Sequence, residues 1–208
     1  MARHAAPLAV ITASHEGDRR AATVSSVTSL SVSPEGAPLI TFNLKLPSKT
    51  SQLIHDSGRF SVNFLSGAHA AEHVARGFAG SIQSTKAIDF VEDDVEIIGV
   101  DWFPLSDAPY DTPILNRTRI KSEEVLASDG IEAAVAFARV DCITKHCFTV
   151  SDHEIWVGEV ERLEIEDERS ASSSTALVYF NRQFVRVSVK DAREGGNKII
   201  KRMHLKHE

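Results

Sequence analysis

The chain contains little cysteine, which excludes a fold held together by disulfides. Only two cysteines, Cys142 and Cys147, occur among 208 residues. Because side chains alternate along a strand, their odd spacing would place them on opposite faces of a shared strand and keep them from pairing. Unpaired cysteines are typical of a reducing compartment, so we expect a cytoplasmic protein.

Positive charge is also scarce. The chain has 23 Lys and Arg residues against 29 Asp and Glu residues, which gives a net charge of −6. Proteins that bind nucleic acid neutralise its phosphates with a basic surface. The charge balance therefore argues against a nucleic-acid partner, and we interpret the one basic stretch, residues 198–206, as a solvated end of the chain.

Long apolar runs are absent as well. No stretch approaches the roughly 18 apolar residues of a membrane-spanning helix. The first residues, M-A-R-H-A-A-P-L, lack the apolar segment of a secretion signal. We therefore expect no membrane partner. The length suits one domain, which we place at residues 1–190, with an excursion at 81–130 and a tail at 191–208.

The chain is rich in short strand patterns. These cover residues 8–12, 22–33, 38–43, 59–65, 133–144, 155–165 and 177–189. Two helices are predicted at 48–57 and 68–78, each followed by a glycine that can end it, and 101–113 reads as a loop that packs its aromatics. Short strands with polar turns predict a mostly β fold with flanking helices, a closed antiparallel barrel. No Gly-rich turn joins a strand to a helix, which argues against a doubly wound dinucleotide-binding sheet.

A fourth absence is local: residues 43–55 contain no acidic residue. Acidic side chains normally stabilise the first turn of a helix because the backbone N–H groups there carry partial positive charge. Here the first turn offers Ser48, Lys49 and Thr50 instead. Free N–H groups, hydroxyls and a lysine can bind a phosphate. The alternative is an ordinary serine N-cap with solvated lysines.

Other candidate residues have ordinary explanations beside the functional ones. The hydroxyl-lined segment 23–29 also suits a solvent-facing strand face. His153 alone reads as a turn histidine, and Gly158 inside a strand suggests a bulge or a close approach. His69 and His73 lie four residues apart on a predicted helix, a spacing that can bind zinc, but no third ligand is evident, so we predict no metal site.

Seven motifs follow one another along the chain. They are residues 10–12 (V-I-T), 23–26 (T-V-S-S), 43–50 (N-L-K-L-P-S-K-T), 58–63 (G-R-F-S-V-N), 78–80 (F-A-G), 152–160 (D-H-E-I-W-V-G-E-V) and 177–180 (L-V-Y-F). In this order they resemble the flavin reductase-like family, whose members bind FMN in a split β-barrel of Greek-key antiparallel strands. The resemblance covers about residues 7–187.

The resemblance implies an NAD(P)H-dependent flavin reductase with FMN, or alternatively FAD, as its flavin. Hydride would pass from the nicotinamide to flavin N5, and His153 would lie near the ring face where the nicotinamide stacks. The implied cofactor-binding residues are Thr23, Val24, Ser25, Ser26, Thr28, Asn43, Ser48, Lys49, Thr50 and Tyr179.

The resemblance also implies a homodimer, and a partner monooxygenase that would receive the reduced flavin. Two alternatives stay open. The protein could keep its FMN and act directly on a small organic substrate, and the long 81–130 segment favours this alternative. It could also be a flavin-binding module without catalysis.

Overall fold

The fold is built almost entirely from antiparallel strands, as expected. The computed structural model describes residues 4–32, 36–79, 91–92, 95–103, 114–121, 135–165 and 175–188, and every strand pair in these ranges is antiparallel. The largest sheet has seven strands, in the order β3 (Asp18–Val24), β2 (Ala9–His15), β6 (Arg59–Leu65), β10 (Ala136–Val150), β11 (His153–Ile165), β5 (Leu39–Lys45) and β4 (Thr28–Ser31).

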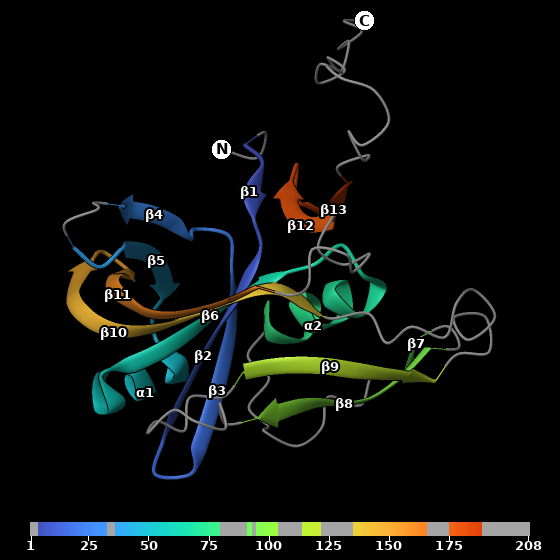
Figure 1. Ribbon diagram of the computed structural model, residues 1–208, viewed down its shortest axis with the longest axis horizontal. Coiled ribbons are helices and arrows are strands. Elements are labelled where there is room, and N and C mark those ends of the chain that lie inside the picture. Colours follow the sequence, from blue (N-terminus) through green and yellow to red (C-terminus); the bar gives the residue numbers. More distant parts are fainter. Residues whose placement is uncertain are drawn as a thin grey trace, which may run out of the picture.

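Two small sheets and two helices complete the described part of the chain (Figure 1). One sheet contains β1 (Ala6–Pro7), β12 (Thr175–Phe180) and β13 (Gln183–Ser188), and the other contains β7 (Val91–Glu92), β8 (Val95–Phe103) and β9 (Ile114–Lys121). The helices are α1 (Lys49–Ser57) and α2 (His69–Ala79). The prediction of a mostly β antiparallel barrel with flanking helices is confirmed. The predicted closure is wrong: the edge strands β3 and β4 of the large sheet are not paired with each other in the described residues, so the barrel is split.

Strand β2 is buried on both faces and separates two hydrophobic clusters. Ala9, Ile11 and Ala13 pack into the larger cluster around Trp156, Phe42 and Phe60. Leu8, just ahead of β2, and Val10 pack into the second cluster, which joins β2 to α2 and β12. The alternation of side chains along the strand thus supplies both cores from one run of apolar residues.

Helix α1 has the boundaries that its local chemistry predicts. Ser48 has an extended backbone and accepts a hydrogen bond from the Ser51 N–H, which is an N-cap. Gly58 adopts a left-handed conformation with φ of 68°, and its N–H donates to the Ile54 carbonyl at 2.8 Å. Leu53 and Ile54 are buried and hold the helix against the barrel. The N-terminus of α1 is therefore fixed in place.

The predicted strand at 22–33 is wrong, because the chain leaves one edge of the sheet there and joins the other. Strand β3 ends at Val24, and β4 begins at Thr28. The Ser26 hydroxyl accepts from the Asn43 N–H at 2.9 Å, which holds the crossing segment against β5. The alternation of apolar and hydroxyl residues continues through the crossing, so the pattern could not reveal it.

A further strand prediction and a loop prediction need correction. The predicted strand at 177–189 is a hairpin, β12 and β13, whose turn residues Asn181 and Arg182 have φ of 50° and 63°. Asparagine tolerates this conformation, which two-residue hairpins favour. Residues 101–103 of the predicted loop belong to β8. The rest of that loop, and the predicted tail at 191–208, lie outside the described residues.

The two cysteines share strand β10 but do not lie on opposite faces. The register shifts between Thr144 and His146, where β10 carries one extra residue, and a second shift occurs beside Cys142. Cys142 is opposite Val160 and Cys147 is opposite Trp156, two positions an even number of residues apart on β11. Both cysteines pack against the larger hydrophobic cluster, and neither forms a disulfide. The bulge therefore overturns the face prediction.

Candidate functional site

A cavity of about 970 Å³ lies where the end of β3, the end of β5, the start of α1 and the start of β11 meet. Strand β3 runs between α1 and α2 (Figure 1). Most of the residues proposed from the sequence line this cavity: Thr23, Val24, Ser25, Ser26, Asn43, Ser48, Lys49, Thr50 and His153. Three separate stretches of chain thus meet around one space. Its volume is at the upper end of the range for small-molecule sites, about 300–1,000 Å³.

The lining of this cavity is positively charged. Arg20, Lys45 and Lys49 line it, and none of its described lining residues is Asp or Glu, although Asp18 pairs with Arg20 and Asp152 with Lys45 from just outside the lining. This is unusual for a chain with a net charge of −6. Arg20 is largely covered, and it keeps its place through an ion pair with Asp18 at 3.5 Å and a hydrogen bond to the Arg19 carbonyl. The cavity is therefore suited to an anion.

The first turn of α1 contributes backbone donors. The Ser51 N–H is bound by the Ser48 hydroxyl at 3.1 Å, and the Gln52 N–H donates to the Ser48 carbonyl at 3.1 Å. These bonds leave the N–H groups of Lys49 and Thr50 as the donors of the first turn for an outside acceptor. The turn contains no acidic residue. Ser48 acts as an N-cap, as the alternative interpretation holds, and its hydroxyl retains a proton to donate.

Strand β3 supplies a polar wall. It is an edge strand of the seven-stranded sheet, so half of its backbone N–H and C=O groups point away from β2. Its hydroxyl groups are partly committed, because the Thr23 hydroxyl donates to the Ala75 carbonyl of α2 at 2.8 Å. The Ser26 hydroxyl likewise bonds the Asn43 backbone. A planar polar ligand would therefore bond mainly to the backbone N–H and C=O groups of β3, and less to its side-chain hydroxyls.

His153 enters the cavity from the first position of β11 and is held by its neighbour. Its Nδ1 lies 2.8 Å from the Asp152 carboxylate. The hydrogen bond from His153 holds the pKa of Asp152 below its ordinary value, which keeps the carboxylate ionised beside the ring. Asp152 was not predicted as an orienting partner, although its place directly before His153 in the motif is a signal for that role.

Two of the proposed residues do not line this cavity. Thr28 is exposed on β4, where it pairs with Thr41. Tyr179 lies on β12 and lines a second cavity, of about 720 Å³, whose wall shares Thr23, Val24 and Ser25 with the first. The two cavities are therefore neighbours on either side of the end of β3.

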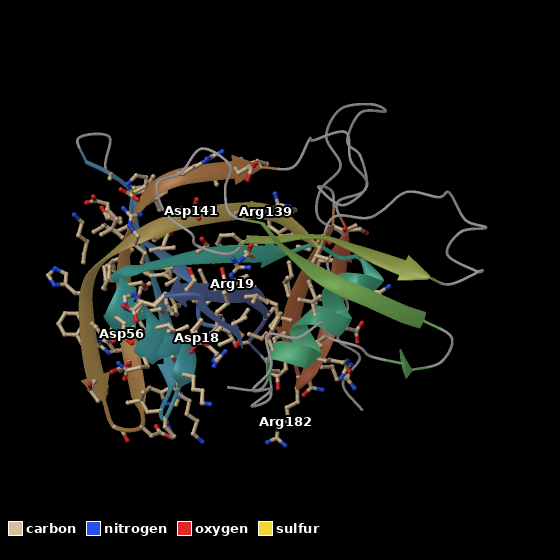
Figure 2. The ribbon with its side chains drawn as sticks, turned by 90° about the horizontal axis from the view of Figure 1, so that it is seen from below. Asp18, Arg19, Asp56, Arg139, Asp141 and Arg182 are labelled. Atoms are coloured by element: carbon tan, nitrogen blue, oxygen red, sulfur yellow. The ribbon has the colours of Figure 1, made fainter. Side chains whose placement is uncertain are left out.

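The second cavity also carries positive charge, which the sequence analysis missed. Arg76 from α2 and Arg182 from the β12–β13 turn line it, again with no carboxylate among the described lining residues. Arg182 projects from the end of that hairpin in Figure 2. Arg76 is held by Glu72 at 2.7 Å and lies 5.0 Å from the centre of the Phe184 ring. These arginines reach the site from elements with no local ligand motif, so spacing could not reveal them.

The region around His69 and His73 forms helix α2, as predicted, but the side chains of both histidines lie outside the described residues. Neither of the two helices in the described ranges is long and apolar enough to cross a membrane.

Comparison with known proteins places this geometry in context. A family model described as flavin reductase like domain matches residues 1–188. Nitrilotriacetate monooxygenase component B from Mycobacterium thermoresistibile superimposes with a TM-score of 0.65 at 21% identity, covering 96% of this chain and 88% of that one. The styrene monooxygenase flavin reductase from Pseudomonas putida S12 gives a TM-score of 0.64 at 19% identity, covering 91% and 95%.

A third similar structure is the NADH:FAD oxidoreductase from Streptomyces globisporus C-1027. Its TM-score is 0.63 at 20% identity, and the match covers 90% of this chain and 89% of that one. At these identities the three structures show a shared fold, which extends over nearly the whole length of each protein.

Proposed function

The chain belongs to the flavin reductase like domain family, and we propose that it passes a hydride from NAD(P)H to N5 of an FMN held in the first cavity. The observation that carries the proposal is the carboxylate-free, cationic cavity at the N-terminus of α1. A phosphate-bearing cofactor is a natural occupant of such a site because helix N–H groups, hydroxyls and lysine all bind anions.

The donor set fits FMN in two parts. Ser48, Lys49 and Thr50 would hold the phosphate through the first turn of α1. The segment from Thr23 to Ser26, which is the end of β3 and the residues directly after it, would face the isoalloxazine ring with backbone donors and acceptors. When bound, the flavin supplies the redox chemistry, and the protein supplies binding and orientation. This division of labour requires no pair of catalytic carboxylates.

The nicotinamide nucleotide needs a place of its own. The chain has no dinucleotide-binding motif, so the nucleotide would have to bind in an open cleft beside the flavin. The second cavity adjoins the first along β3, and Arg76 and Arg182 give it a charge that suits a pyrophosphate. We propose this cavity for the pyrophosphate part of the nucleotide, with Tyr179 in its wall, while the nicotinamide ring would reach past the end of β3 to the flavin beside His153.

The proposal is tested by mixing the purified protein with NADH or NADPH, with and without added FMN. Consumption that depends on added FMN supports a reductase that releases its flavin. A yellow protein that consumes neither nucleotide would contradict the proposal. It would then favour a flavoprotein that acts directly on an organic substrate, or a flavin-binding module without catalysis.

His153 should matter for hydride transfer more than for binding FMN. The variant His153→Asn is expected to slow reduction of bound FMN about tenfold. This corresponds to the loss of one hydrogen bond, of about 1.4 kcal/mol, from the imidazole to the nicotinamide amide or the flavin edge. FMN affinity should stay within a few-fold. Anaerobic stopped-flow reduction measures the rate, and fluorescence titration measures the affinity.

The matched control is His146→Asn, a change at an exposed histidine of β10 outside the cavity. Equal reduction rates in wild type and His153→Asn would make His153 a structural turn residue. Loss of FMN binding in His153→Asn would instead make it a ligand of the cofactor.

We also propose a homodimer that delivers reduced flavin to a monooxygenase. Two of the similar structures, nitrilotriacetate monooxygenase component B and the styrene monooxygenase flavin reductase, carry names that place them in monooxygenase systems. Large apolar side chains are exposed at both ends of the β10–β11 hairpin, among them Phe148 (53% exposed) and Ile165 (60%). Burial of such side chains is a main source of stability in subunit contacts. Light scattering at micromolar concentration should give twice the chain mass, and a monomer that binds flavin fully would contradict this.

A further inference from the structure

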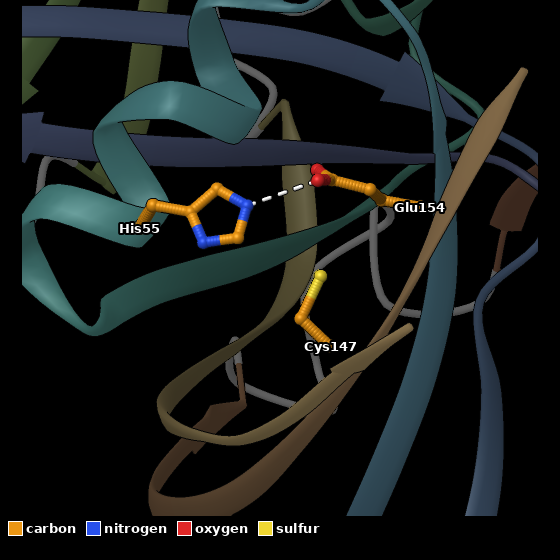
Figure 3. Close-up of side chains that lie close together, drawn as sticks. All are labelled: His55, Cys147 and Glu154. Atoms are coloured by element: carbon orange, nitrogen blue, oxygen red, sulfur yellow. Dashed lines mark hydrogen bonds and ion pairs between the residues drawn. The ribbon is translucent and has the colours of Figure 1, made fainter. Parts of the chain in front are cut away.

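Away from both cavities, three side chains from three elements converge at the other end of α1. His55 lies in the last turn of α1, Cys147 on β10 and Glu154 on β11 (Figure 3). One ligating atom from each lies within 4.8 Å of the others. The imidazole Nε2 is already 3.0 Å from a Glu154 carboxylate oxygen. We propose that these three residues bind a divalent transition-metal ion, Zn²⁺ by the chemistry of its ligands.

The ligand set decides the class of metal. An imidazole, a thiolate and a carboxylate are the three ligand types that bind zinc in proteins, whereas Mg²⁺ and Ca²⁺ prefer oxygen alone. Zinc bonds of about 2.0–2.3 Å in tetrahedral geometry put ligand atoms roughly 3.5 Å apart. Since His55 and Glu154 are already closer than this, the remaining contraction of about 1 Å falls on Cys147, whose side chain rotates about a single bond.

The surroundings orient two of the ligands before any metal arrives. The Ser51 hydroxyl donates to the second carboxylate oxygen of Glu154 and accepts from the indole N–H of Trp156 at 3.2 Å. The His55 ring packs on the Trp156 ring with centroids 4.6 Å apart. Such hydrogen bonds behind a ligating carboxylate are a regular feature of metal sites. His55 is 45% exposed, which leaves room for water as a fourth ligand.

The protonation of the site is consistent with metal binding. Burial raises the pKa of Glu154, but hydrogen bonds from Ser51 and His55 outweigh it and hold the carboxyl below its ordinary value, so it is ionised at neutral pH. Burial and the Glu154 charge raise the pKa of Cys147 to about 11, so the thiol is protonated without metal. Binding would replace the hydrogen bond from His55 Nε2 to Glu154, with the imidazole proton moving to Nδ1 so that Nε2 can ligate the metal. It would also form the Zn–S bond and release the thiol proton to solvent, with no change in oxidation state.

The β10 bulge makes this arrangement possible. Without the extra residue between Thr144 and His146, Cys147 would lie on the face of β10 opposite to the one that faces Trp156 and Glu154. The site also joins α1 to the β10–β11 hairpin, and it does not depend on flavin binding. A bound metal should therefore stabilise the fold in the absence of FMN.

The test uses flavin-free, chelator-treated full-length protein titrated with Co²⁺, with Zn²⁺ as competitor. Wild type is expected to develop thiolate-to-cobalt charge-transfer absorption at one Co²⁺ per chain, and Zn²⁺ should abolish it. Cys147→Ser should lose the absorption. His55→Gln, whose amide can still donate to Glu154, should weaken binding at least tenfold. The control His146→Gln should bind as wild type does, and circular dichroism checks that each variant is folded.

A second readout needs no variant. Zn²⁺ should slow alkylation of Cys147 in wild-type protein, followed by mass spectrometry of the modified peptide. The proposal is overturned if wild type shows no charge-transfer band, if the band survives in Cys147→Ser, if it is lost in Cys142→Ala instead, or if Zn²⁺ leaves alkylation of Cys147 unchanged. None of these outcomes depends on whether the protein reduces flavin.

Discussion

The variant Lys49→Glu is expected to bind FMN about 10 to 100 times more weakly than wild type. A charge-assisted hydrogen bond to the phosphate is worth about 1.5–3 kcal/mol, and each 1.4 kcal/mol is about a factor of ten. The new carboxylate would also repel the phosphate. The fold should not suffer, because Lys49 is exposed and an acidic residue in the first turn of a helix is favourable.

Riboflavin provides the internal comparison because it lacks the phosphate. Fluorescence titration should show that Lys49→Glu binds riboflavin within about threefold of wild type, as expected when no phosphate contact is lost. Lys145→Glu makes the same change in net charge on β10, outside the cavity, and should leave FMN affinity almost unchanged. Equal weakening of FMN and riboflavin, or no weakening of either, would rule out a phosphate at the start of α1.

Lysine 49 is a better probe than Ser48 because Ser48 has a structural role. Its hydroxyl caps α1, and removal of an N-cap typically costs about 0.5–2 kcal/mol of stability. A loss of FMN affinity in a Ser48 variant would therefore mix two effects. The Lys49 change separates them, since the side chain takes no part in the cap.

The second large effect is expected on stability: Gly158→Ala should lower the free energy of unfolding by about 1–3 kcal/mol. A Cβ atom on Gly158 would lie 2.2 Å from Cζ of Phe60 and 3.0 Å from Cβ of Cys142. The Phe60 ring is fully buried and packs edge-on against Phe42 at 4.9 Å, so it has little room to move. Thermal unfolding should shift by about 2–4 °C for each kcal/mol in a chain of this size.

Gly36→Ala is the matched control, since a Cβ on Gly36 meets nothing within 4 Å. The double variant Gly158→Ala/Phe60→Leu should lose less unfolding free energy than the two single variants lose in sum. The smaller Leu side chain makes room for the methyl group of the alanine. A melting temperature of Gly158→Ala equal to that of wild type would show that the core adapts to the added atom.

The parts of the fold that the sequence predicted depend on neighbouring residues. Helix α1 begins at a serine cap and ends at a left-handed glycine, and both signals lie within its own turns. The parts that were missed depend on distant contacts. The bulge beside Lys145 changes which face Cys147 occupies, and the crossing at Ser26 is fixed by the backbone of Asn43. Neither leaves a mark on local alternation.

The same distinction holds for the candidate site. The segments 23–26 and 43–50 carry their polar residues consecutively, so their composition was visible in the sequence. Arg20, Arg76 and Arg182 line the cavities from β3, α2 and the β12–β13 turn, which are distant in sequence and come together only in the fold. Long flexible side chains of this kind occur on any surface, and only the packing of β3 against α2 and near the β12–β13 hairpin gives these three a common role.

The position of β2 has a consequence for how the molecule melts. Its residues alternate between the two hydrophobic clusters, with Ile11 in one and Val10 in the other, both fully buried. Disrupting either cluster would expose one face of β2, whose other face packs in the remaining cluster. The two halves of the described fold are thus tied into a single cooperative unit, and neither can be lost while the other keeps its full stability.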